Sequence, residues 1–208
     1  RPVRGYERTW GKPAWGDAAD LQPDTSFIGR VLPEGRSDPR SSDFWWLIGR
    51  YLADGWRSAA PSQRGKGRVI ICCAKPEATE LERRIQAAGF TACRANERTG
   101  IKFHITQTWL WRFLEQFGHR AEGKRVPGWV LGLRKGKARA LLDGYLSGDG
   151  YKHGAERRGL TVSKALALGM ALVAQRACGT VVGVGRRVPP ATTVIEGRTV
   201  NQRPYWTI

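Results

Sequence analysis

Two apolar segments of this 208-residue chain have a helical spacing and run into the same short motif. Residues 44–48 lead into Leu47-Ile-Gly-Arg-Tyr-Leu-Ala-Asp-Gly55, and residues 140–142 lead into Leu142-Asp-Gly-Tyr-Leu-Ser-Gly-Asp-Gly150, 95 residues later. Glycine is the residue that most readily takes the left-handed conformation just past a helix end. The pattern therefore predicts two helices that each end at an Asp-Gly pair.

The stretches after the two motifs share an order of strands and helices. Short runs of β-branched and apolar residues predict strands, and longer amphipathic runs predict helices. After the first motif we expect strands at 68–74, 91–95 and 101–106 and helices at 77–88 and 108–117. After the second motif we expect strands at 160–162, 180–184 and 192–200 and a helix at 164–178. This order predicts a repeat of two mixed α and β halves.

Small residues lie four positions apart in each motif and so share one helix face: Gly49 with Ala53, and Gly144 with Gly148. Small side chains let two helices approach closely. Such packing would bring Asp54 and Asp149 together at helix C-termini, where the helix dipole disfavours negative charge. Two converging carboxylates need a compensating cation, and Mg²⁺ prefers oxygen ligands. A lone Asp-Gly would indicate a cap or a hairpin turn, but two copies favour chemistry.

Charge is distributed unevenly along the chain. With 35 Lys and Arg against 18 Asp and Glu, the formal net charge is +17 and the pI is near 10.6. Residues 1–43 hold seven basic and seven acidic side chains, whereas residues 44–208 hold 28 and 11. Basic runs interleaved with aromatic residues favour a nucleic-acid partner over the alternative of a merely solvated basic face.

The composition also excludes several classes of protein. A hydrophobic fraction of 41% excludes a disordered polycation. No apolar stretch approaches the length of a membrane span, and no apolar segment follows the basic N-terminal residues to form a secretory signal. We therefore expect a cytoplasmic (intracellular) protein without membrane association.

The two nonapeptides resemble the paired signatures of LAGLIDADG (dodecapeptide, DOD-type) homing endonucleases in their single-chain, double-motif form. The resemblance covers about residues 44–208, with halves at 44–137 and 138–208. It implies an α+β fold of two pseudo-twofold-related αββαββα halves. The elements that we expect in the second half lack the last helix of this pattern. It also implies a monomer that cleaves both strands of a long double-stranded DNA target with Mg²⁺ (or Mn²⁺).

The resemblance assigns roles to individual residues. Asp54 and Asp149 would be the catalytic, metal-binding residues, with the carbonyls of Ala53 and Gly148 as neighbouring metal ligands. Lys124 resembles the catalytic lysine that family members place in the solvent network of the active site. The alternative for Lys124 is an exposed or phosphate-contacting lysine. Its second-half counterpart would fall near position 219, whereas the sequence ends at residue 208.

Basic side chains on or beside the predicted strands are the candidate DNA-binding residues, because paired β-ribbons fit the major groove. In the first half they are Arg64, Lys66, Arg68, Arg94, Arg98, Lys102 and His104, and in the second half Lys152, Arg157, Arg158, Arg186, Arg187 and Arg198. Trp56 and Tyr151 directly follow the two motifs. We expect both to pack beneath the metal site, with a DNA contact as the alternative.

Residues 1–43 form a separate segment rich in Pro, Gly and Asp. Residues 13–24 resemble the strand and turn of intein splicing (Hint-type) domains that precede an inserted nuclease, although the expected Gly before Asp24 is missing. We interpret the segment as a splicing-domain remnant or a linker. The chain has Arg1 in place of a splicing nucleophile and lacks a C-terminal His-Asn pair, so we expect no self-splicing.

These features are compatible with two main classes of function. An intein-encoded, site-specific homing endonuclease is the first interpretation, because both motif aspartates are present. A non-cleaving nucleic-acid-binding protein of the same fold, either an RNA maturase or a DNA-binding regulator, is the alternative; an inert fragment is a third. The motifs depart from the family at Leu52 and Ser147, where many members carry Asp, and at Arg50 near the helix interface.

Overall fold

The computed structural model describes residues 35, 37–58, 67–154, 156–179, 182–195 and 198–208. The chain divides into two units, residues 1–31 and residues 32–208, and the second unit holds every described residue. The predicted segment 1–43 therefore lies mostly outside the described residues, and its boundary stays a prediction. In the part of the chain that the structure describes, no helix is both long enough and apolar enough to cross a membrane.

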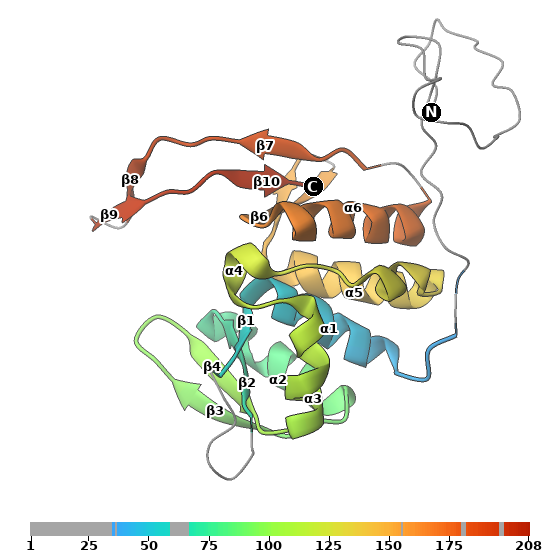
Figure 1. Cartoon of the computed structure of the whole chain (residues 1–208). Helices are drawn as coiled ribbons and strands as arrows, with labels where there is room; N and C mark the ends of the chain where they lie inside the picture. The colour runs from blue at the N-terminus through green and yellow to red at the C-terminus, as the bar shows by residue number, and fades with distance from the viewer. Residues whose placement is uncertain (1–34, 36, 59–66, 155, 180–181, 196–197) are drawn as a thin grey trace, which may run out of the picture. The chain divides into compact units, whose positions relative to one another are not determined.

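Four helices form a row through this unit (Figure 1). The two motif helices, α1 (Ser42–Asp54) and α5 (Lys135–Gly148), pack against each other at its centre. α2 (Ala78–Ala87) packs on the outer side of α1, and α6 (Lys164–Cys178) packs on α5. The side chain of Ser41 fixes the start of α1, because its hydroxyl accepts a hydrogen bond from the backbone N–H of Phe44 at 3.1 Å.

Each half contributes one four-stranded antiparallel sheet with the same topology. The first sheet has the order β1-β2-β4-β3 and comprises β1 (Gly55–Arg57), β2 (Val69–Cys73), β3 (Ala92–Asn96) and β4 (Ile101–Ile105). The second has the order β5-β6-β10-β7 and comprises β5 (Gly150–His153), β6 (Glu156–Thr161), β7 (Gly185–Arg187) and β10 (Tyr205–Thr207). Strand for strand the two orders correspond, so the two halves repeat the same sheet topology.

The halves differ in their last elements. In the first half β4 leads into α3 (Thr108–Phe113), a 3₁₀ helix (Leu114–Phe117), the short α4 (Arg120–Gly123) and a second 3₁₀ helix (Gly128–Gly132). Among the described residues of the second half, no helix comes after α6. The α+β fold that the resemblance implied is confirmed.

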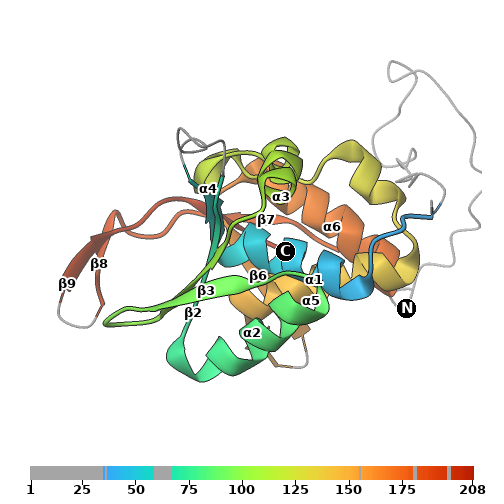
Figure 2. The ribbon, with the colours of Figure 1, turned by 90° about the horizontal axis from the view of Figure 1, so that it is seen from below.

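Several predicted boundaries need correction. The strand expected at 192–200 is an antiparallel hairpin, β8 (Thr192–Ile195) and β9 (Arg198–Asn201), which extends away from the helices (Figures 1 and 2). The strand expected at 180–184 begins only at Gly185, and the described residues 182–184 are not in a strand. The strands β1, β5 and β10 were not predicted, because three or four residues are too few to show an alternating pattern.

Two glycines set the distance between the motif helices. A Cβ atom on Gly49 would overlap the carbonyl oxygen of Leu141, and a Cβ atom on Gly144 would overlap the carbonyl oxygen of Trp46. These contacts are reciprocal, since Trp46 and Leu141 are also 95 residues apart. The backbones of α1 and α5 thus touch at two equivalent places, as the small-residue spacing predicts.

Replacing Gly144 with Ala should force the helices apart, because the new methyl group would meet backbone atoms of α1. We expect Gly144→Ala to lower the free energy of unfolding by about 1–3 kcal/mol, as overpacking a core does. Urea denaturation measures this. The matched control is Gly136→Ala on the same helix, where no atom lies within 4 Å of the added Cβ. Because Gly136 lies in the first turn of α5, that variant should change the free energy of unfolding by less than about 0.5 kcal/mol. An equal loss in both variants would contradict the close packing of the helices.

Candidate functional site

The close helix packing brings the two motif aspartates to the same end of the helix pair. α1 ends at Asp54, and Asp149 directly follows the last residue of α5. A Cβ atom on Gly148 would overlap a carboxylate oxygen of Asp54, so the end of one motif contacts the aspartate of the other. The predicted convergence of Asp54 and Asp149 therefore agrees with the placement of both residues.

The glycines that follow the aspartates have another role than the one predicted. Gly55 has φ −108° and is extended, and neither Gly55 nor Gly150 takes a left-handed conformation. A Cβ atom on Gly55 would lie 2.8 Å from the Cα of Tyr51, and one on Gly150 would overlap the carbonyl oxygen of Leu146. Both positions need glycine because the chain turns from helix to strand against its own last helical turn.

Both carboxylates are held in an environment that opposes their ionisation. Burial, and then the charge of Asp54, raise the pKa of Asp149 from its ordinary value of 3.8 to about 6, against the opposing effect of Lys124 and Arg50. Burial also raises the pKa of Asp54, while Arg50 and Lys124 act to lower it. The pair therefore concentrates negative charge that a bound cation would stabilise.

Two hollows flank the aspartates, and each draws on both motifs. The Asp149 compartment, a cleft of about 550 Å³, is lined by Asp149, Ala53 and Lys124 among others. The Asp54 compartment, of about 360 Å³, is lined by Asp54, Gly148 and Arg50 among others. Each compartment thus pairs the aspartate of one motif with the residue that precedes the aspartate of the other motif.

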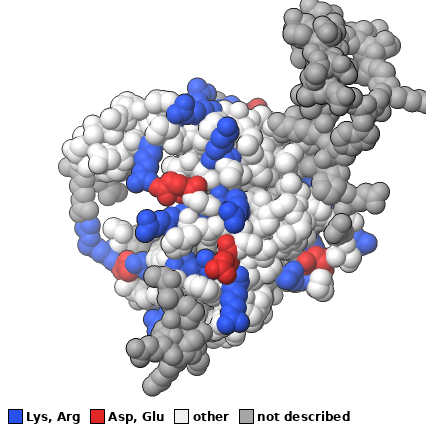
Figure 3. Space-filling view, viewed as in Figure 1, with Lys and Arg blue, Asp and Glu red and all other residues white. Residues whose placement is uncertain are grey.

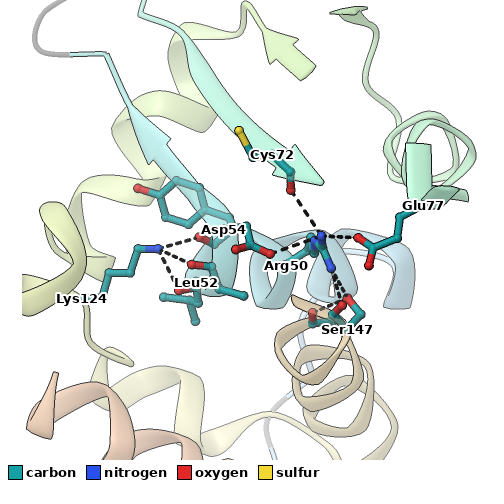
Figure 4. A network of polar contacts seen from close by, with 10 residues as sticks. Arg50, Leu52, Asp54, Cys72, Glu77, Lys124 and Ser147 are labelled. Atoms are coloured by element: carbon teal, nitrogen blue, oxygen red, sulfur yellow. Dashed lines mark hydrogen bonds and ion pairs between the residues drawn. The ribbon is translucent and has the colours of Figure 1, made fainter. Parts of the chain in front are cut away.

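Lys124 is a buried residue that lines the Asp149 compartment. Its ammonium donates to the carbonyl oxygens of Tyr51, Leu52 and Ala53 at 3.1, 2.8 and 3.0 Å (Figure 4). The residue is 7% exposed, so the alternative of an exposed lysine is wrong. Burial lowers the pKa of Lys124 to about 8, although Asp149 and Asp54 act to raise it. The hydroxyl of Ser163 fixes this segment by donating to the Lys124 carbonyl at 2.6 Å.

Arg50 lines the Asp54 compartment. From the sequence, this residue was expected only to lie near the helix interface. Its Nη2 lies 3.2 Å from a carboxylate oxygen of Asp54 and 2.8 Å from one of Glu77. The guanidinium also donates to the carbonyl oxygens of Cys72 and Ser147 (Figure 4). An arginine inside an apolar helical run was the signal for such a role, but all of its partners except Asp54 lie 22 to 97 residues away.

The sheet faces turned away from the helices border the two compartments. Cys72 and Lys102, on the first of these faces, line the Asp54 compartment. Leu160 and Tyr205, on the second, line the Asp149 compartment. Each compartment therefore borders the outward face of one sheet.

The strand register divides the predicted DNA-binding residues between the two sides of the sheets. The outward faces carry Lys102, His104, Arg158 and Arg187, and Arg68, which directly precedes β2, continues the same alternation. The helix-side faces carry Arg94, Lys152, Arg157 and Arg186. Because side chains alternate along a strand, these two sets do not share one surface. The hydrogen bond from Arg157 to Asp143 of α5, at 3.3 Å, agrees with its helix-side position.

The remaining predicted contacts lie outside the sheets proper. Arg98 is exposed between β3 and β4. Arg198 lies in β9, but its side chain is outside the described residues, as are Arg64 and Lys66 entirely. Figure 3 shows Lys and Arg side chains in several groups over one face of the molecule, with few acidic side chains between them.

Trp56 and Tyr151 do not pack beneath the aspartates. Their side chains are 37% and 40% exposed. In the register Trp56 pairs with Ile70 and Tyr151 pairs with Arg158, which puts both aromatic rings on the outward faces. The first expectation for these residues is wrong, and the alternative of a DNA contact stays a prediction.

The donor set at the aspartates fits a hard divalent cation. Among the residues that the structure describes, no group of three or more His, Cys, Asp and Glu could hold a metal. The side chains thus supply the carboxylates of Asp54 and Asp149, and backbone carbonyls lie beside them. Mg²⁺ is usually bound by one or two carboxylates plus water and substrate phosphate. The carbonyl of Ala53 already accepts a hydrogen bond from Lys124, which leaves its second lone pair for a ligand.

Comparison with known proteins bears on the fold. No protein-family model matches the chain, and no curated protein matches it. The crystal structure of I-DmoI in complex with DNA and calcium is similar at a TM-score of 0.53 and 12% identity, over 80% of this chain and 81% of that chain. An I-DmoI variant bound to nicked target DNA with manganese gives 0.54 and 11%, over 80% and 86%. Another variant bound to target DNA with magnesium gives 0.52 and 13%, again over 80% and 86%. The described part of the chain therefore has the α+β fold of LAGLIDADG homing endonucleases.

Proposed function

We propose that this chain is a site-specific DNA endonuclease of the homing type, which cuts both strands of a long target in a divalent-metal-dependent reaction. The proposal rests on the two compartments, each of which combines residues of both motifs. Each sets an aspartate of one motif beside the residue before the aspartate of the other. Two such sites, one for each strand, are what a double-strand break requires.

The proposed chemistry uses the oxygen atoms at the helix ends. The carboxylates of Asp54 and Asp149, with the carbonyls of Ala53 and Gly148, would hold Mg²⁺ or Mn²⁺. A bound ion of this kind supplies positive charge for the attacking water and for the leaving oxygen of the phosphodiester. Lys124 donates to carbonyl oxygens at the end of α1, and the ion pair of Arg50 with Asp54 fixes the direction of that carboxylate.

The proposed DNA-binding surface is formed by the outward faces of the two sheets. These faces carry basic side chains of both halves, Lys102 and Arg187 among them, and the exposed rings of Trp56 and Tyr151. The pseudo-twofold arrangement lets one chain contact two half-sites, so the protein would act as a monomer. The similar I-DmoI structures hold DNA bound to the same fold, which supports this surface.

An intein origin is part of the proposal. It is supported by the resemblance of residues 13–24 to a splicing-domain turn that precedes an inserted nuclease. We therefore propose that the nuclease portion begins near residue 44 and that the preceding segment is a splicing-domain remnant or a linker.

One observation favours the second candidate, a non-cleaving nucleic-acid-binding protein of the same fold. Arg50 forms an ion pair with Asp54 at 3.2 Å and so already neutralises one of the two aspartates. A protein that binds without cutting would tolerate this pair, whereas a nuclease must accommodate a metal beside it. The endonuclease is preferred because Asp149 has no such ion pair among the contacts of the described residues.

The endonuclease proposal predicts DNA ends at one sequence. Purified protein incubated with a genomic DNA library and Mg²⁺ should produce double-strand ends that cluster at a single site when captured and sequenced. EDTA should abolish the ends, and so should the double variant Asp54→Asn/Asp149→Asn, which should still bind the recovered sequence. Retained cutting by the double variant would contradict the site, and sequence-specific binding without any cutting would favour the second candidate.

The carboxylate pair should cost stability when no metal is bound. Because the folded state raises the pKa of Asp149 to about 6, the unfolded chain releases this proton at a lower pH than the folded protein does. The free energy of unfolding should therefore fall as the pH rises from about 4 through 6. Asp149→Asn should therefore raise the free energy of unfolding in EDTA by about 1–3 kcal/mol at pH 7.5, and by almost nothing at pH 4.

Urea denaturation at the two pH values tests this, with Asp143→Asn on the same helix as the control. Asp143 forms ion pairs with Arg139 at 3.1 Å and Arg157 at 3.3 Å, so its removal should cost up to about 1 kcal/mol. Loss of stability in both variants at pH 7.5 would show that Asp149 is not under electrostatic stress.

Neighbouring arginines of β7 test which sheet face meets DNA. Arg187 lies on the outward face and Arg186 on the helix side, and both are exposed. Arg187→Gln should weaken binding to duplex DNA and lower the slope of log affinity against log salt by about one, whereas Arg186→Gln should leave the slope unchanged. Fluorescence anisotropy over a salt series measures both, and the reverse order would place DNA on the other face.

A further inference from the structure

Each motif helix ends against a buried cation from a different part of the chain. The ammonium of Lys124 donates to the carbonyl oxygen of Leu52 in the last turn of α1 at 2.8 Å. The guanidinium of Arg50 donates to the carbonyl oxygen of Ser147 in the last turn of α5. Leu52 and Ser147 occupy the same motif position, 95 residues apart. Lys124 and Arg50 therefore satisfy equivalent carbonyls at the two helix C-termini.

The origin of these cations breaks the symmetry of the repeat. Lys124 directly follows α4, whereas Arg50 comes from inside α1 itself. The counterpart of Arg50 in the second motif is Tyr145, whose hydroxyl donates to the carbonyl oxygen of Leu160 at 2.6 Å. Arg50 makes the same kind of sheet contact to Cys72 at 3.3 Å.

The two sheet carbonyls occupy equivalent positions in the register. Gly55 pairs with Ile71, and Gly150 pairs with Gly159, so Cys72 and Leu160 each follow the partner of a motif glycine. Arg50 thus keeps the sheet contact of its counterpart and adds a positive charge beside Asp54.

We propose that Arg50 is the cationic positioning residue of the Asp54 compartment, the counterpart of Lys124 in the Asp149 compartment. The inference rests on the proposed endonuclease function. The side chain of Arg50 is 5% exposed, so it acts on DNA through Asp54 and not by direct contact. One nitrogen, Nη2, lies between the carboxylates of Asp54 and Glu77 and fixes the direction of the Asp54 side chain.

The arrangement makes the two compartments unequal toward a metal ion. Nη2 of Arg50 lies 3.2 Å from a carboxylate oxygen of Asp54, so its charge would compete with an ion bound at that carboxylate. Lys124 instead contacts carbonyl oxygens, including that of Ala53. Removal of the charge of Arg50 should therefore loosen the orientation of Asp54 and strengthen metal binding at that aspartate.

Strand-resolved cleavage of the recovered target tests the positioning role. Asp54→Asn and Asp149→Asn first assign one DNA strand to each aspartate. Arg50→Met should slow cutting of the Asp54 strand by about tenfold, a loss of about 1.4 kcal/mol, and change the other strand less than about twofold. Lys124→Met should have the opposite strand preference. Equal slowing of both strands by Arg50→Met would indicate a merely structural role and overturn the proposal.

Manganese binding followed by electron paramagnetic resonance gives a readout that does not need cleavage. In the Asp149→Asn background the remaining site is Asp54, and Arg50→Met should tighten its Mn²⁺ affinity by about tenfold. In the Asp54→Asn background the same change should have no effect. Unchanged affinity in the first background would overturn the proposal, even if the wild-type protein proves unable to cut DNA.

Glu77→Gln is a second variant that tests the role of Arg50 if Arg50→Met does not fold. It removes the other carboxylate that pairs with the Arg50 guanidinium. The Glu77 side chain is 49% exposed, so its replacement should not disturb the core. Without this second carboxylate the charge of Arg50 acts on Asp54 alone, and Mn²⁺ affinity in the Asp149→Asn background should fall by about threefold. Arg50→Lys keeps the charge and should stay near the wild-type affinity. A tighter site in Glu77→Gln would contradict the competition between Arg50 and the metal.

Discussion

The backbones of α1 and α5 are in direct contact, and this contact positions both the aspartates and the sheets. Gly49 and Gly144 let the two helices approach until each glycine lies against a carbonyl oxygen of the other helix. The same contact brings the end of each helix to the aspartate of the other, as Gly148 against Asp54 shows. The two sheets then continue directly from the helix ends, so packing, topology and the placement of the aspartates have one common cause.

The two helix C-termini and the two carboxylates repel one another because all of them carry negative charge or partial negative charge. Nearby buried cations offset this repulsion. Buried cations donate to the terminal carbonyls, Lys124 at α1 and Arg50 at α5. The pKa of Asp149 is nevertheless raised to about 6, first by burial and then by Asp54. Sites that retain unfavourable charge in this way trade stability for activity. The asymmetry between lysine and arginine leaves the two aspartates in different surroundings although the motifs are a repeat.

The sequence predicted the features that depend on periodic patterns and missed those that depend on long-range contacts. The 95-residue repeat and the spacing of Gly49 and Gly144 predicted the helix pair and the convergence of the aspartates. Short strands such as β1 carry too few residues to show a pattern. Outward and helix-side arginines, such as Arg187 and Arg186, cannot be told apart without the strand register. The contacts of Arg50 join segments far apart in the chain, so its charge was visible but its partners were not.

Anomalous diffraction from crystals of the protein with its recovered DNA target and Mn²⁺ tests the claim that each motif aspartate helps to hold a metal ion, because it locates the metal independently of activity. We predict manganese in both compartments, with Asp149 and the carbonyl of Ala53 as ligands in one and Asp54 and the carbonyl of Gly148 in the other. Manganese bound away from these residues, or both carboxylates of the pair without metal in the DNA complex, would contradict that claim.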